Sequence, residues 1–264
     1  MYGRYQLIRK YFRYYMSASN GKGHGVHSPF VFDFIKHVLN DTTQYEAYQK
    51  IESRRSVLLQ DKSVIRVEDL GAGPVVSQST ARQVGKIAAR SLKPKKFAQL
   101  LFRMVAYYKP SQVIELGTSL GITTSYLAAG NKAVVHTLEG SSTIANIAKE
   151  TFDSLGVENI KQHIGNFDDT FPPLLPNALH PLFVFVDGNH RKEPTLRYFQ
   201  EILKHIETST IIVFDDIHWS EGMEEAWEDI KNNPSVTLSI DLFFIGIVFF
   251  RSDFKVKQHF SVRF

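Results

Sequence analysis

One strand-turn-helix segment near the middle of the chain constrains the fold more than any other feature. Residues 113–121 have the sequence VIELGTSLG, in which a short apolar run ends at the acid Glu115 and a turn of small residues leads into a helical pattern. A second apolar run, residues 133–138, ends at Glu139. In a doubly wound α/β fold, such turns lie at the carboxyl ends of neighbouring parallel strands, and an acid on the second strand binds a ribose. The two acids therefore predict a nucleoside site.

The glycine spacing of this turn separates two classes of cofactor. A dinucleotide-binding turn has the pattern G-x-G-x-x-G, which lets the backbone and the helix N-terminus approach a pyrophosphate. Here Ser119 and Ile122 occupy the second and third glycine positions. The carboxylate of Glu115 would repel a diphosphate and attract a cation, such as the ammonium or sulfonium group of S-adenosylmethionine. The turn therefore favours a methyl donor.

Composition bounds the class of protein. With 264 residues, 43% of them hydrophobic, the chain can form one large α/β domain with an N-terminal extension. It contains no cysteine, which excludes disulfides and thiolate chemistry. No stretch approaches the roughly 20 apolar residues of a membrane span. We expect a cytoplasmic protein without a membrane partner.

From residue 95 onward, apolar strand patterns alternate with helical patterns. We expect strands at 112–116, 133–138, 159–163, 182–187 and 210–214, with helices at 121–129, 141–155, 192–206 and 221–231. This alternation predicts a parallel sheet with helices on both faces. The last apolar runs, 236–240 and 243–250, are too close for a crossover helix and should form an antiparallel hairpin. We therefore predict a helical N-terminal extension or lid, residues 1–94, and a ligand-binding domain, residues 95–264.

The N-terminal half is basic and aromatic. Neither residues 1–27 nor residues 70–114 contain an acid. Arg82, Lys86, Arg90 and Lys93 are three or four residues apart, so a helix beginning near residue 80 would carry them on one face. Such a face is either simply solvated or a surface for RNA or an acidic partner.

A second glycine turn competes with the first. Residues 68–73, EDLGAG, also combine acids with glycines. However, no acid occurs between Asp69 and Glu115 to end a second strand, and Pro74 stands where a helix should open. We interpret this segment as a structural turn near the entrance of the site.

Taken together, the strand ends, the turns and the terminal hairpin resemble the class I S-adenosylmethionine-dependent methyltransferases over about residues 95–250. The resemblance implies an α/β, Rossmann-like, doubly wound and mostly parallel seven-stranded sheet with an antiparallel C-terminal hairpin. It places Glu139 on the ribose hydroxyls and Asn166 with Phe167 near the adenine, although an ordinary turn and core residue remain the alternative for that pair. The cofactor-binding residues that it implies are Glu115, Gly117, Thr118, Ser119, Gly121, Glu139, Asn166, Phe167 and Asp187.

Two further segments narrow the resemblance. Two sequence motifs of the cation-dependent O-methyltransferases, of the catechol, caffeoyl-coenzyme A and macrolide types, look like residues 183–190, FVFVDGNH, and 211–219, IIVFDDIHW. The resemblance implies that Asp187, Asp215 and Asp216 are metal ligands. Such an oxygen-only set suits Mg²⁺ or another hard divalent cation. The alternative for Asp216 is helix capping, because successive strand residues point in opposite directions.

The sequence offers two histidines as candidates for the general base. The catechol-type pattern has an acid and a lysine where this chain has Asn189 and His190. Imidazole titrates near neutrality, so His190 and then His218 are the candidate bases.

We therefore expect methyl transfer from S-adenosylmethionine to a hydroxyl of a small molecule or sugar, with a divalent cation assisting. One alternative is an RNA or protein acceptor bound by the basic N-terminal half. Another is a non-catalytic binding module that retains the fold. The aromatic N-terminal helix makes a homodimer plausible.

Overall fold

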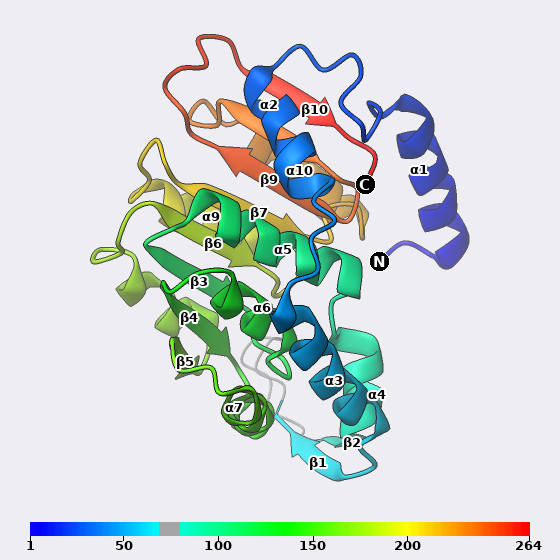
Figure 1. Ribbon diagram of the computed structural model, residues 1–264, viewed down its shortest axis with the longest axis vertical. Coiled ribbons are helices and arrows are strands. Elements are labelled where there is room, and N and C mark those ends of the chain that lie inside the picture. Colours follow the sequence, from blue (N-terminus) through cyan, green and yellow to red (C-terminus); the bar gives the residue numbers. More distant parts are fainter. Residues whose placement is uncertain (69–79) are drawn as a thin grey trace. The chain divides into compact units, whose positions relative to one another are not determined.

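The computed structural model describes residues 1–68 and 80–264 (Figure 1). By its internal contacts the chain forms two compact units, the first comprising Met1–Asp41 with Asn177–Phe264 and the second Thr42–Pro176. This grouping differs from the expected division after residue 94, which stays a prediction. The second glycine turn lies, from Asp69 onward, outside the described residues.

The second unit contains three parallel strands in the order β3-β4-β5. They are β3 (Gln112–Leu116), β4 (Val134–Glu139) and β5 (Ile160–Ile164). Every residue of β3 is buried, as expected for a strand covered on both faces. Helix α5 (Lys95–Tyr108) precedes β3, and the predicted helices are present as α6 (Ile122–Gly130) and α7 (Ser142–Leu155). A short helix α8 (Phe167–Thr170) and a 3₁₀ turn η2 (Pro172–Leu174) follow β5.

The remainder of this unit departs from the predicted helical extension. It consists of α3 (Glu46–Gln60), an antiparallel ribbon of β1 (Val64–Val67) with β2 (Thr80–Gln83), and α4 (Val84–Ser91). The basic helix face predicted for Arg82, Lys86, Arg90 and Lys93 is wrong, because Arg82 lies in β2 and Lys93 follows the end of α4. Only Lys86 and Arg90 share the helix.

The first unit contains a five-stranded sheet in the order β10-β8-β9-β7-β6. Its strands are β6 (Leu182–Val186), β7 (Ile211–Asp215), β8 (Leu238–Asp241), β9 (Ile245–Phe249) and β10 (Gln258–Ser261). The β6-β7 pair is parallel, and β9 runs antiparallel to both β7 and β8, so the predicted C-terminal hairpin is confirmed. Strand β10, which pairs parallel to β8 at the edge, was not predicted. Helices α9 (Lys192–Leu203) and α10 (Glu221–Asn232) follow β6 and β7.

The first unit also includes the N-terminal helices. These are α1 (Arg4–Ser17), α2 (Pro29–Phe34) and the π-helical turn η1 (Ile35–Leu39), all of which fall where the sequence predicted helix. Helix α1 has no buried residue. None of the helices in the described parts of the chain has the length and apolar character needed to cross a membrane. The predicted α/β class, the mostly parallel pairing and the reversed C-terminal strand are therefore confirmed.

Candidate functional site

The carboxyl ends of β3, β4 and β5 meet at one edge of the sheet of the second unit, where backbone hydrogen bonds join them. The amides of Gly117 and Thr118 both donate to the carbonyl of Leu138 at 3.0 Å. The amide of Gly165 donates to the carbonyl of Glu139 at 2.9 Å. Each turn is thereby held against the neighbouring strand, which brings the predicted acids of β3 and β4 close together.

Glu115 is completely buried in this edge. Its Oε2 atom accepts hydrogen bonds from the hydroxyls of Thr124 (2.5 Å) and Thr137 (2.7 Å), whereas its buried Oε1 atom accepts none from the described residues. Burial raises the pKa of Glu115 to about 7, although the two threonine hydrogen bonds oppose this shift. A buried acceptor without a partner typically costs about 1–3 kcal/mol. A cationic or N–H-donating ligand group is the kind of partner that would remove this cost.

Glu139 links the two turns. Its Oε2 atom accepts from the amide of Ser119 at 2.9 Å, and its Oε1 atom accepts from the amide of Ser141 at 3.0 Å. Burial raises the pKa of Glu139, and the backbone hydrogen bonds from Ser141 and Ser119 oppose this change. Each carboxylate oxygen keeps a further lone pair, so Glu139 can also accept from the two hydroxyls of a ribose.

The turn between β3 and α6 requires left-handed backbone at three positions. Gly117, Ser119 and Gly121 have φ angles of 106°, 48° and 81°. A Cβ atom on Gly121 would lie 2.6 Å from the ring of Phe152 on α7. Gly121 therefore allows α6 to pack against α7, and this packing is sufficient to explain the glycine without a ligand.

Asn166 and Phe167 begin the short helix α8. The side chain of Asn166 accepts a hydrogen bond from the amide of Asp168 at 3.1 Å, which is the geometry of an N-cap. Asn166 is exposed and Phe167 is half-buried. Capping explains Asn166 without a ligand, so the predicted contact of this pair with adenine stays a prediction.

The first unit holds a cluster of polar side chains at the carboxyl ends of its parallel strands. Asp187 follows β6, Asp215 ends β7, and His190 lies in the loop after Asp187; one ligand atom of each lies within 4.8 Å of the others. The Nε2 atom of His190 is 3.5 Å from Oδ1 of Asp187. The structure thus brings together two of the three predicted metal ligands, with His190 in the position predicted for Asp216.

The backbone explains this exchange. Asp216 is the first residue after β7 and has a φ angle of 52°. Its amide donates to the carbonyl of Phe244 at 2.7 Å. Asn189 and His190 also have positive φ angles, 65° and 27°, and Nδ2 of Asn189 donates to the hydroxyl of Tyr198 at 2.6 Å. Left-handed backbone at two consecutive non-glycine residues is uncommon and is concentrated at functional loops. It places the imidazole of His190 beside Asp187.

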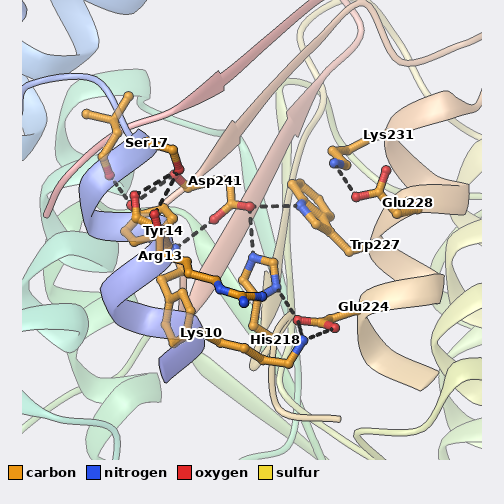
Figure 2. A network of polar contacts seen from close by, with 12 residues as sticks. Lys10, Arg13, Tyr14, Ser17, His218, Glu224, Trp227, Glu228, Lys231 and Asp241 are labelled. Carbon is orange, nitrogen blue, oxygen red and sulfur yellow. Dashed lines mark hydrogen bonds and ion pairs between the residues drawn. The ribbon is translucent and has the colours of Figure 1, made fainter. Parts of the chain in front are cut away.

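His218 lies instead in a network of polar contacts (Figure 2). Its Nδ1 atom is 3.1 Å from Oε1 of Glu224, and its Nε2 atom is 2.9 Å from Oδ2 of Asp241. Burial alone would lower the pKa of His218, but hydrogen bonds with Asp241 and Glu224 and their charges outweigh burial and raise it. Because both ring nitrogens are engaged, this geometry favours a structural role for His218 and leaves His190 as the better candidate for chemistry. Sequence reasoning missed Glu224 and Asp241, since they approach His218 from α10 and β8.

A cavity of about 410 Å³ lies beside the turn after β3 in the second unit. Three cationic side chains line it, namely those of Arg82, Lys86 and Arg90. The hydroxyl of Ser91, also in the lining, lies 2.8 Å from that of Ser119 in the turn. The basic residues therefore surround a concave site and do not form the flat helix face predicted from their spacing.

Comparison with known proteins assigns this arrangement to a class. Residues 114–217 match a family model described as a methyltransferase domain. No curated protein sequence matches the chain.

Several solved structures share the fold. An SAH-bound methyltransferase of Podospora anserina, PaMTH1, has a TM-score of 0.58 at 14% identity over 85% of this chain and 97% of its own. An O-methyltransferase of Bacillus cereus in complex with SAH has a TM-score of 0.55 at 19% identity over 83% and 97%. The O-methyltransferase TomG of Streptomyces achromogenes, in complex with SAM, has a TM-score of 0.53 at 18% identity over 80% and 92%.

At these identities the structural similarity establishes the fold, and the family match establishes the methyltransferase domain. Residues 114–217 therefore match a methyltransferase domain, and the chain has the fold of the class I S-adenosylmethionine-dependent methyltransferases that the sequence predicted.

Proposed function

We propose that the protein transfers a methyl group from S-adenosylmethionine to a hydroxyl group of a small molecule, with a divalent cation bound by Asp187, His190 and Asp215. The cluster of these three ligand atoms within 4.8 Å is the observation that carries the proposal. Two of the structures that share the fold, from Bacillus cereus and Streptomyces achromogenes, are O-methyltransferases, which supports the same reaction.

The donor would bind at the carboxyl ends of β3 and β4. Methionine-derived ligands carry an ammonium group and S-adenosylmethionine also a sulfonium, and the buried carboxyl of Glu115 supplies a complementary charge once it ionises. Glu139 would accept from the ribose hydroxyls with its remaining lone pairs. The two amides that already hold Glu139 fix its orientation before the ligand arrives.

A cation at the cluster would lower the pKa of an acceptor hydroxyl, so that its proton could pass to solvent water before the oxygen takes the methyl group. Because a histidine replaces the third carboxylate, the donor set contains nitrogen as well as oxygen, which suits Mn²⁺ and other transition metals better than the predicted oxygen-only set. A metal-bound imidazole has no lone pair left to accept a proton. We therefore assign His190 to the metal and not to the role of general base.

The acceptor is proposed to be small and to carry an acidic group. Arg82, Lys86 and Arg90 line a cavity, and a cavity of about 410 Å³ fits a small ligand better than a nucleic-acid strand. The RNA alternative loses its main argument, because only Lys86 and Arg90 share a helix and the four cations do not form the predicted basic helix face. A cytoplasmic location remains part of the proposal, and a homodimer stays a prediction from the sequence.

Calorimetry tests the donor and metal sites separately. Glu139→Ala should weaken SAH binding at least tenfold, because the ribose loses its acceptor, and Asp187→Asn should weaken Mn²⁺ binding by a similar factor while leaving SAH affinity unchanged. Glu158→Gln, which neutralises an exposed acid, is the control and should change neither affinity.

Either half of the proposal can fail independently. If SAH at millimolar concentration produces no binding heat, the donor site is wrong. If SAH is released from S-adenosylmethionine at the same rate with and without a chelator, in the presence of a phenolic or sugar acceptor, the metal has no part in the reaction.

A further inference from the structure

Helix α1 carries an uncovered apolar stripe. Its exposed large side chains include Tyr5, which is 87% exposed, and Phe12, which is 63% exposed. At about 100° per residue, the exposed apolar side chains fall within one arc of about 100° on the helix surface. The members of the stripe are Tyr5, Ile8, Phe12, Tyr15 and Met16, and the exposed Met1 precedes the helix.

Arginines border the stripe on both sides. The same helical spacing places Arg4 at one edge and Arg9 with Arg13 at the other, and all three are exposed. Within residues 1–68 and 80–264, none of the three forms a salt bridge. Residues 1–27 contain no acid that could neutralise them. The stripe is therefore an apolar surface with a positively charged rim.

The opposite face of α1 is fixed to the first unit, as Figure 2 shows in part. Lys10 Nζ donates to Oε2 of Glu224 at 2.8 Å, and the hydroxyl of Tyr14 donates to the carbonyls of Val262 and Asp241. The ring of Tyr11 packs edge-on against Phe243 at a centroid distance of 5.0 Å. Because these contacts hold one face of the helix against the unit, the stripe is presented outward.

We propose that α1 docks the protein onto the surface of an anionic phospholipid bilayer. A helix with an apolar face and flanking arginines lies in the plane of the interface, with its apolar side chains at the acyl boundary and its guanidinium groups near the phosphates. Anionic lipids attract such cations, and salt weakens the attraction. The sequence predicts no membrane partner because it contains no segment that could span a bilayer. A helix that lies on the bilayer surface does not need such a segment.

Charge favours a bilayer over a second copy of the chain. A two-fold symmetric contact pairs a surface with itself. If the stripes of two copies packed against each other, the arginines of the two rims would face and repel one another. Helix α1 contains no acid that could neutralise this repulsion. A bilayer of anionic lipids instead supplies phosphates along the whole rim.

Vesicle co-sedimentation of the full-length protein tests the inference independently of the methyl-transfer reaction. At low salt, the protein should partition at least tenfold more strongly into vesicles of equal phosphatidylglycerol and phosphatidylcholine than into pure phosphatidylcholine, and 0.5 M NaCl should remove most of the difference. The double variant Ile8→Ser/Phe12→Ser and the variant Arg9→Glu/Arg13→Glu should each lose at least tenfold of the partition. Val256→Ser is the matched control, because it removes an apolar side chain that is 73% exposed outside α1.

Two results would overturn the proposal. One is equal sedimentation of the wild type and of the Ile8→Ser/Phe12→Ser variant, with circular dichroism showing both to be folded. The other is a wild-type dimer in analytical ultracentrifugation that this variant abolishes while vesicles bind neither protein, which would assign the stripe to self-association.

Discussion

Glu115 allows the electrostatics of the donor site to be tested through stability. Its pKa is raised to about 7 from an ordinary value of 4.5, chiefly because the carboxyl is buried. The folded protein therefore prefers the protonated acid. The resulting stability is fully present below pH 4.5 and is lost as the pH rises through 7.

The magnitude follows from the size of this shift. One pKa unit corresponds to about 1.4 kcal/mol, so between pH 5 and pH 8 the ionisation of Glu115 should destabilise the ligand-free fold by about 2–3 kcal/mol. Glu115→Gln cannot ionise and should escape this loss. Relative to the wild type, the variant should therefore become about 2–3 kcal/mol more stable as the pH rises over this range. The glutamine has its own packing and hydrogen-bond cost, but that cost does not depend on pH.

Urea unfolding followed by far-ultraviolet circular dichroism is the suitable assay. Far-ultraviolet circular dichroism follows the helices and strands of both units, whereas both tryptophans, Trp219 and Trp227, belong to the first unit. Other titrating groups are common to both proteins and cancel in the comparison. Thr124→Val provides a second check, because it removes a hydrogen bond that lowers the pKa of Glu115 and should move the transition to higher pH. If the stability difference between wild type and Glu115→Gln is the same at pH 5 and pH 8, the carboxyl is not perturbed and the reasoning fails.

Two further predictions concern packing and the polar network. Gly121→Ala should cost at least about 2 kcal/mol more in thermal unfolding than Gly156→Ala, because both residues have positive φ but only the first would press on Phe152; equal losses would contradict this. Asp241 and Glu224 raise the pKa of His218 despite its burial, so its contribution is present below pH 6.5 and lost as the pH rises through the folded value. The difference in Tm between wild type and His218→Gln should therefore shrink from pH 6 to pH 9, and a constant difference would argue against the network.

The fold was largely predictable because buried parallel strands appear in the sequence as uninterrupted apolar runs. Strands β3 to β7 and the hairpin of β8 with β9 lie within two residues of the predicted limits, as the five buried residues of β6 illustrate. Strand β10 lacked this signal, because its residues Gln258–Ser261 are nowhere fully buried. The spacing of Arg82 from Lys86 suggested a helix, but Arg82 instead pairs with Ile65 across the β1-β2 ribbon. Local periodicity does not reveal such a distant partner.

The candidate site was predictable only where its residues lie at or next to a strand end. The sequence places Glu115, Glu139, Asp187 and Asp215 at such positions, and the structure agrees, while their roles in binding stay predictions. The sequence spacing of Asp187 and His190 was visible, but the left-handed backbone that turns the imidazole beside the carboxylate was not. Side chains that meet from separate elements left no pattern in the sequence.

The amides of Gly117, Thr118 and Gly165 tie the three strand ends of the second unit together through main-chain groups alone. Such a framework places few demands on the side chains around it, because every residue except proline offers an amide, although the positive φ angles of Gly117 (106°) and Gly165 (143°) favour glycine at those two positions. Mutation can therefore replace most of the surrounding side chains without altering where the loops begin. This tolerance offers a physical explanation for why the fold persists in proteins that are only 14–19% identical to this chain. The side chains that bind ligands can change while the backbone framework stays the same.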